Sequence, residues 1–200
     1  PAGKIRVAPR IEYFSQADNA FPQLVDFGKT AGAWRGDDPA EKFNATATRV
    51  QGASTPPGAQ SAVQLAVRDN RLKGRITLQS PRSTLRPNTD YVAGVLYKSD
   101  RSGWDSPINK GAAIVEYADQ GAVRAQPMHL FEVPYWSWEL TRFKSDARAT
   151  RAEMEVWNRG WALGQEGESW YGAAFLVPTD RLRLLDTAAP EMIVEVKAAT

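Results

Sequence analysis

The fold is most clearly indicated by residues 85–99, which read LRPNTDYVAGVLYKS. Residues 91–97 are apolar on both faces of an extended chain, as expected of a central strand that is covered on both sides. The turn residues at 86–89 come directly before this run, and a second turn cluster follows it at 98–103. The pattern therefore predicts a central strand between two turns.

Further strand patterns occur on both sides of this segment. Residues 63–67 alternate between apolar and other side chains, and Ala152, Met154 and Val156 alternate with three charged residues. The other candidate strands are residues 43–50, 75–79, 112–117, 137–145, 169–177 and 192–197. No segment carries a helical stripe over three turns. We therefore predict an all-β fold, a β-sandwich jelly roll.

Composition excludes several kinds of chemistry. The chain has 200 residues, of which 42% are hydrophobic and 24% charged, as in a folded globular protein. It has no cysteine, so disulfides, thiolate metal sites and cysteine nucleophiles are excluded, and its single histidine, His129, excludes a multi-histidine metal site. The 25 basic residues balance 23 acidic ones, and no apolar run reaches the roughly 18 residues of a membrane span. We expect neither a nucleic-acid partner nor a membrane.

The two ends of the chain differ from its middle. Residues 1–20 contain one short apolar run after a basic, proline-punctuated lead, and we expect them to form an N-terminal arm. The jelly-roll domain is predicted at 21–180, and residues 181–200 are predicted to be an extension that packs on this domain or on a neighbouring subunit. The chain opens with Pro1-Ala2-Gly3-Lys4 and shows no apolar signal peptide. We expect the protein on a virion surface or outside the cell.

Three segments carry a resemblance to a known family. They are residues 85–99, residues 138–145, and residues 152–157 continuing through a glycine-containing loop to 170–177. In this order they are similar to carbohydrate-binding modules of the family 4/9 type, which are galactose-binding-like β-jelly rolls. Residues 24–27, which precede Trp34, match more weakly. The resemblance covers about residues 24–178 and implies a non-catalytic module that binds a glycan.

The family's paired aspartates fall here on Gly172 and Ala173. The resemblance therefore implies that this chain has lost a ligand of the structural calcium that such modules often hold. We expect no cofactor and no metal ion.

Aromatic residues are the candidates for glycan binding. The chain has seven tryptophans and six tyrosines, and flat rings stack on the C–H faces of sugars. Along an extended chain Trp136 and Trp138 lie on one face and Tyr135 on the other. We predict that a glycan contacts Trp34, Trp104, Trp136, Trp161 and Tyr135. We expect Trp138, Trp157 and Trp170 instead to fill the core or to pack under loops.

A catalytic site is not expected. Glu153 and Glu155 lie two apart on one strand face, about 7 Å between Cβ atoms, whereas retaining glycosidases hold their carboxyl groups roughly 5–5.5 Å apart. The preferred interpretation of this pair is an outward charged face shared with Arg151. His129 has no nucleophile or ligand partner nearby in the sequence and is expected to be structural.

Two functions therefore stay open. The first is a non-catalytic module that attaches to a glycan or polysaccharide. The second is a structural decoration protein of a virus capsid or tail, whose arms dock on neighbouring subunits by adding strands to them.

Overall fold

The computed structural model describes residues 3–7, 11–21, 44–57, 59–68, 74–100, 108–130, 133–160, 166–185 and 192–196. Within these ranges the chain forms strands and three short 3-10 helices, η1 (Gln16–Asp18), η3 (Gly52–Ser54) and η4 (Thr179–Arg181), and no α-helix. In chain order the strands are β1 (Gly3–Val7), β2 (Ile11–Tyr13), β3 (Ala45–Gln51), β4 (Ser61–Val67), β5 (Gly74–Gln79), β6 (Ser83–Thr84), β7 (Asp90–Ser99), β8 (Ile108–Ala118), β9 (Gly121–Met128), β10 (Ser137–Lys144), β11 (Arg151–Gly160), β12 (Gly167–Pro178), β13 (Arg183–Leu185) and β14 (Met192–Val196).

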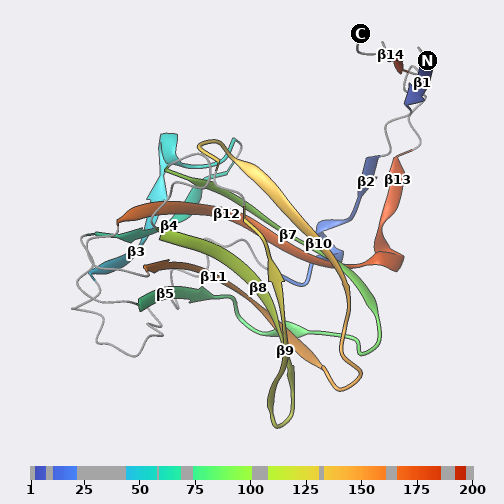
Figure 1. Cartoon of the computed structure of the whole chain (residues 1–200). Helices are drawn as coiled ribbons and strands as arrows, with labels where there is room; N and C mark the ends of the chain where they lie inside the picture. Colours follow the sequence, from blue (N-terminus) through green and yellow to red (C-terminus); the bar gives the residue numbers. More distant parts are fainter. Residues whose placement is uncertain are drawn as a thin grey trace.

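Two antiparallel sheets form the body of the molecule (Figure 1). The front sheet has the strand order β10-β7-β12-β4-β3, and the back sheet has the order β5-β11-β8-β9, with the short β6 also paired to β11. Neighbours in these sheets are mostly distant in sequence, as in a sandwich whose chain crosses between layers. The predicted all-β sandwich is confirmed, and each predicted strand segment overlaps an observed strand.

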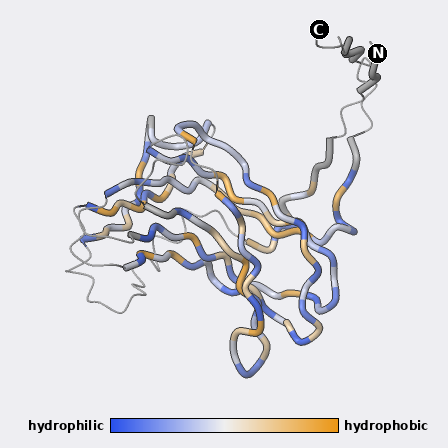
Figure 2. Tube along the Cα trace, in the orientation of Figure 1, coloured by the Kyte–Doolittle hydropathy of each residue, from blue (hydrophilic) through white to orange (hydrophobic). Residues whose placement is uncertain are grey.

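The core lies between the two sheets. Its largest fully buried side chains include Tyr97 and Tyr171 of the front sheet and Ile114 and Met154 of the back sheet. Figure 2 shows hydrophobic residues along the strands of both sheets and hydrophilic residues at many of the turns. No tryptophan belongs to this core cluster among the described residues.

Strand β7 is apolar on both sides because both of its faces are covered. Tyr91, Val95 and Tyr97 belong to the core between the sheets. On the opposite face Val92 forms a second apolar cluster with residues of β12. This arrangement confirms the prediction of a central strand at 91–97.

The turn before β7 is held by side-chain hydrogen bonds. Asn88 adopts a left-handed conformation with φ 51°, which asparagine tolerates better than most residues. The Ser145 hydroxyl accepts a bond from the Thr89 N–H at 2.9 Å and donates one to the Arg86 carbonyl at 2.7 Å. The turn is thereby tied to the segment that follows β10.

A buried asparagine connects the two sheets. Asn158 of β11 is fully buried, and its Nδ2 donates to the carbonyl of Leu65 in β4 at 2.9 Å. Its Oδ1 accepts a bond from the Ser169 hydroxyl of β12 at 2.6 Å. Buried polar groups of this kind are stable only when they are paired, so these bonds fix how the sheets face each other.

The two ends of the chain pair with each other. β1 pairs with β14, and β2 pairs with β13, as two separate two-stranded antiparallel ribbons. Figure 1 shows the β1–β14 ribbon beyond the sandwich, with β2 and β13 between it and the sheets. No helix in the described ranges is long and apolar enough to cross a membrane.

Candidate functional site

The outer face of the front sheet carries a group of neighbouring aromatic and polar side chains. The side chains of Tyr97 and Tyr171 point into the core, so their neighbours Lys98 and Trp170 lie on the opposite face. Both are half-buried. Because the two residues are directly paired across β7 and β12, they lie side by side on this face.

A row of five side chains crosses this face from edge to edge. Lys98 pairs with Trp170, Trp170 pairs with Gln64 of β4, and Gln64 pairs with Thr48 of β3. Trp136, which directly precedes β10, continues the row on the other side of Lys98. The sequence of groups is thus ring, ammonium, ring, amide and hydroxyl. We call these five residues the cross-strand row.

The ring of Trp136 lies close to Gly172. A Cβ placed on Gly172 would lie 3.2 Å from Cζ3 of Trp136 and 2.3 Å from Cγ of the buried Pro56. Gly172 is also the residue at which the register between β12 and β7 shifts, between Tyr171 and Ala173. The bulge and the missing side chain together leave space for the Trp136 ring on the outer face.

Lys98 lies between the two rings of the row. Its Nζ is 4.8 Å from the ring centroid of Trp170 and 5.4 Å from that of Trp136. Both distances are within the range of a cation–π interaction. The ammonium therefore has a fixed place between two aromatic surfaces.

The polar end of the row is organised by an ion pair. Gln64 Nε2 donates to Glu168 Oε2 at 2.8 Å, and Glu168 also pairs with Arg68. This orients the Gln64 amide, whose oxygen and second N–H are not used by that bond. Thr48 is exposed beside it and adds a hydroxyl.

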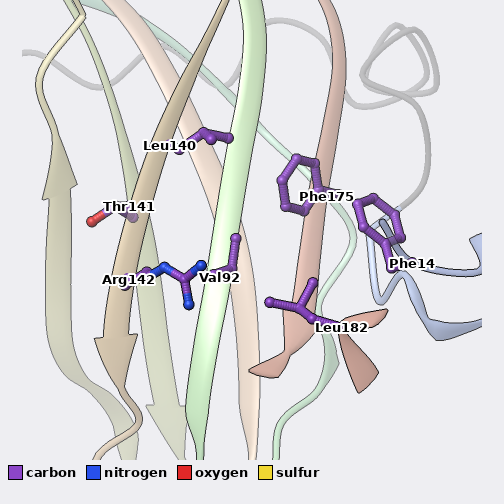
Figure 3. A pocket seen from close by; sticks show the side chains of 7 residues that line it. All are labelled: Phe14, Val92, Leu140, Thr141, Arg142, Phe175 and Leu182. Carbon is purple, nitrogen blue, oxygen red and sulfur yellow. The ribbon is translucent and has the colours of Figure 1, made fainter. Parts of the chain in front are cut away.

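An apolar hollow continues the same face towards the other end of β7. Phe14, Val92, Leu140, Phe175 and Leu182 line it, together with Thr141 and Arg142, and its volume is about 330 Å³ (Figure 3). The exposed Trp138 ring lies 5.4 Å from the ring of Phe175, centroid to centroid. Trp138 therefore links the hollow to the cross-strand row.

The structure describes two of the five predicted glycan contacts. Trp136 is in the cross-strand row, and Tyr135 beside it is 63% exposed. Trp34, Trp104 and Trp161 lie outside the described residues.

The interpretation of Trp138, Trp157 and Trp170 as core residues is wrong, since none of the three is buried and all lie on outer sheet faces. Trp170 belongs to the row, which was not predicted from the sequence; its alternation with the buried Tyr171 is the signal that could have placed it on the outer face.

Glu153 and Glu155 do not form a solvated charged face. They lie on the outer face of the back sheet but are only 4% and 6% exposed, whereas Arg151 is exposed. Gln79 Nε2 donates to Oε1 of both carboxylates, at 3.0 Å and 2.6 Å, and Arg82 Nε lies 3.1 Å from Oε2 of Glu153. These partners compensate the buried charges, which is why the carboxylates are tolerated there.

Tyr117 completes this buried group. Its hydroxyl donates to Glu153, and the guanidinium of Arg82 lies 3.7 Å from its ring centroid. Burial and the neighbouring Glu153 raise the pKa of Tyr117. Each polar group here already has protein partners, so the arrangement is explained by stability. No cluster of three or more potential metal-binding side chains was found in the described part of the chain.

No protein-family model and no curated protein matches the chain. Solved structures do resemble it. The enzymatically active domain of tailspike protein 4 of bacteriophage CBA120 matches with a TM-score of 0.54 and 16% identity over 82% of this chain. A carbohydrate-binding module of the β-sandwich superfamily matches with a TM-score of 0.50 and 10% identity, over 88% of this chain and 75% of that one.

A family 61 carbohydrate-binding module in complex with β-1,4-galactotriose has a TM-score of 0.46 and 14% identity, with 82% of this chain and 97% of that one covered. The chain spans 22% of the tailspike protein it matches. At these identities the likeness concerns the fold alone. The chain has the β-sandwich jelly-roll fold found in carbohydrate-binding modules.

Proposed function

We propose that this chain is a non-catalytic glycan-binding module and that a polysaccharide lies across the outer face of the front sheet. The observation that carries the proposal is the cross-strand row, in which two tryptophan rings alternate with groups that form hydrogen bonds. Sugar rings have apolar C–H faces, which stack on aromatic rings, and hydroxyl groups at their rims, which form hydrogen bonds. The alternating groups of the row therefore suit both parts of a sugar.

The dimensions of the row support a polymeric ligand. Adjacent strands lie about 4.8 Å apart, so five strands span on the order of 19 Å. That width is enough for several sugar rings in succession. Trp138, which is 46% exposed, and the hollow beyond it extend the face beyond the row. Tyr135, Trp34, Trp104 and Trp161 are proposed as further contacts.

Substitution of the two rings tests the proposal. We expect Trp170→Ala and Trp136→Ala each to weaken polysaccharide binding at least tenfold, because each removes a stacking surface from the row. Trp157→Ala is the matched control, since Trp157 is a half-buried ring on the outer face of the back sheet. Binding is measured by calorimetry against a panel of soluble polysaccharides, with thermal unfolding of each variant as a check on folding. Equal losses in all three variants would contradict the proposal.

Membership of family 4/9 is a finer proposal and rests on the sequence segments at 85–99, 138–145 and 152–177. The structural calcium that such modules often hold bears on this proposal, since a rise in melting temperature with calcium would favour membership. With Gly172 and Ala173 at the positions of the paired aspartates, we expect calcium to leave the melting temperature unchanged.

A second function, decoration of a virus particle, is favoured by the terminal ribbons. β1–β14 and β2–β13 each have two strands, and in the described part of the chain no third strand joins either ribbon. Such open edges are places where another chain can add a strand. Light scattering over a wide concentration range distinguishes the two cases, since a module that only binds glycans stays monomeric. This function would place the protein on a virion surface, and the first would place it there or outside the cell.

A further inference from the structure

Lys98 lies between the two rings of the cross-strand row, and no described residue provides a carboxylate partner for its charge. It makes cation–π contacts with Trp136 and Trp170 but no ion pair with any described residue. Half-burial between two rings removes part of the water that would otherwise solvate the ammonium. A partly desolvated cation in a binding face favours an anionic ligand group.

The carboxylates that flank the row are already paired. Asp100 follows Lys98 by two positions and accepts a bond from the buried Lys110 at 2.8 Å. Glu168 precedes Trp170 by two positions and pairs with Arg68. Among the described residues, the positive charge of Lys98 between the two rings is therefore left without a carboxylate.

We propose that the cross-strand row binds an anionic polysaccharide, whose charged substituent pairs with Lys98 while its sugar rings stack on Trp136 and Trp170. The substituent is a carboxylate or a sulfate ester, both of which accept charge-assisted hydrogen bonds from an ammonium. This inference rests on the glycan-binding function proposed above and names the class of glycan. Gln64 and Thr48 then bind the hydroxyls of the next sugar along the row.

The test compares anionic polysaccharides with neutral ones, two of which share their backbone with an anionic polymer. Polygalacturonate, its fully methyl-esterified form and a sulfated galactan are titrated into the full chain, together with neutral xylan and galactan. We expect the anionic polymers to bind at least tenfold more tightly than the neutral ones, and the advantage to shrink with added salt. Comparing polygalacturonate with its methyl ester shows how much of the binding depends on the carboxylate charge. Comparing the sulfated galactan with neutral galactan shows the same for a sulfate ester.

Variants assign the effect to Lys98. Lys98→Gln is expected to reduce binding of the preferred anionic polymer at least tenfold and to leave binding of the methyl ester unchanged. Lys144→Gln is the matched control, because Lys144 is an exposed lysine on the outer face of β10 and makes no cation–π contact with a described ring. Lys98→Arg retains the charge and is expected to retain the preference, which guards against a folding defect in the glutamine variant.

The outcomes separate this inference from the function on which it rests. If neutral polymers bind as tightly as anionic ones and Lys98→Gln has no effect, the anionic preference is wrong while the glycan-binding function stands. If no polymer of either kind binds the wild-type chain, both fail. If Lys144→Gln has the same effect as Lys98→Gln, the preference comes from overall charge and Lys98 has no special part in it.

Discussion

At the scale of single residues, the outer faces are built by aromatic rings that lie over glycines. Phe175 pairs directly with Gly94, and a Cβ on Gly94 would lie 2.3 Å from the Phe175 ring. Trp157 pairs directly with Gly111, where the corresponding distance is also 2.3 Å. In both pairs the missing side chain lets the ring lie close against the neighbouring strand. The hollow of the front sheet depends on the first of these pairs.

Gly94→Ala is expected to destabilise the fold by about 1–3 kcal/mol, because the new methyl group overlaps the Phe175 ring and Leu140. Chemical denaturation measures the loss. Adding Phe175→Leu to Gly94→Ala removes the ring that the methyl group meets, so the double variant should lose less than the two single losses combined. Simple additivity would show that the overlap is not the cause.

Tyr171 is expected to make stability sensitive to alkaline pH. Burial raises its pKa well above the ordinary value. The unfolded chain releases this proton near pH 10 and the folded chain does not, so the free energy of unfolding falls as the pH rises above about 10. Tyr171→Phe should lose less stability than wild type between about pH 8 and pH 11 in denaturation experiments. Parallel losses in the two proteins would refute this assignment.

The residue-scale site was only partly predictable. The alternation at 151–156 correctly separated Met154 from Glu153 and Glu155, but the expectation that the two carboxylates are solvated was wrong. The burial of Glu153 depends on Arg82, which is distant in sequence. The row was missed for the same reason. Lys98 joins Trp170 only through the register of β7 with β12, which a single sequence does not reveal.

At the scale of elements, β11 is linked to the front sheet by Asn158. We expect Asn158→Ala to reduce the free energy of unfolding by roughly 1–3 kcal/mol, because it leaves the buried hydroxyl of Ser169 without its acceptor. Ser169→Ala removes one bond but leaves the bond from Asn158 to Leu65, so its effect should be smaller. A loss from Ser169→Ala equal to that from Asn158→Ala would mean that the bond to Leu65 adds nothing. Urea denaturation of both variants measures the difference.

Strand patterns predicted the interior strands well and an edge strand poorly. β7 is recognisable by its continuous apolar run, because both of its faces are covered, and β11 by its period-2 alternation, because it buries one strongly apolar face. β9 was not predicted, because it lies at the edge of the back sheet and contains Pro127 and several exposed residues. Proline at an edge removes no bond from the interior of the sheet, so the sequence there has little to constrain it.

At the scale of the whole molecule, the sandwich presents two different outer faces. The back sheet carries the buried Glu153 and Tyr117, which bond to each other and are covered by the exposed Arg82. The front sheet carries the cross-strand row and the hollow, with the exposed rings of Trp138 and Tyr135 nearby. This asymmetry is the basis for placing the ligand on the front sheet.

Fluorine NMR tests this placement most directly. The chain is labelled with 5-fluorotryptophan, and its seven tryptophan signals are assigned by single Trp→Phe substitutions. It is then titrated with the tightest-binding polysaccharide. We predict that the signals of Trp136 and Trp170 shift with saturable dependence on the polysaccharide and that the signal of Trp157 stays in place. A shift of Trp157 without shifts of Trp136 and Trp170 would contradict the account.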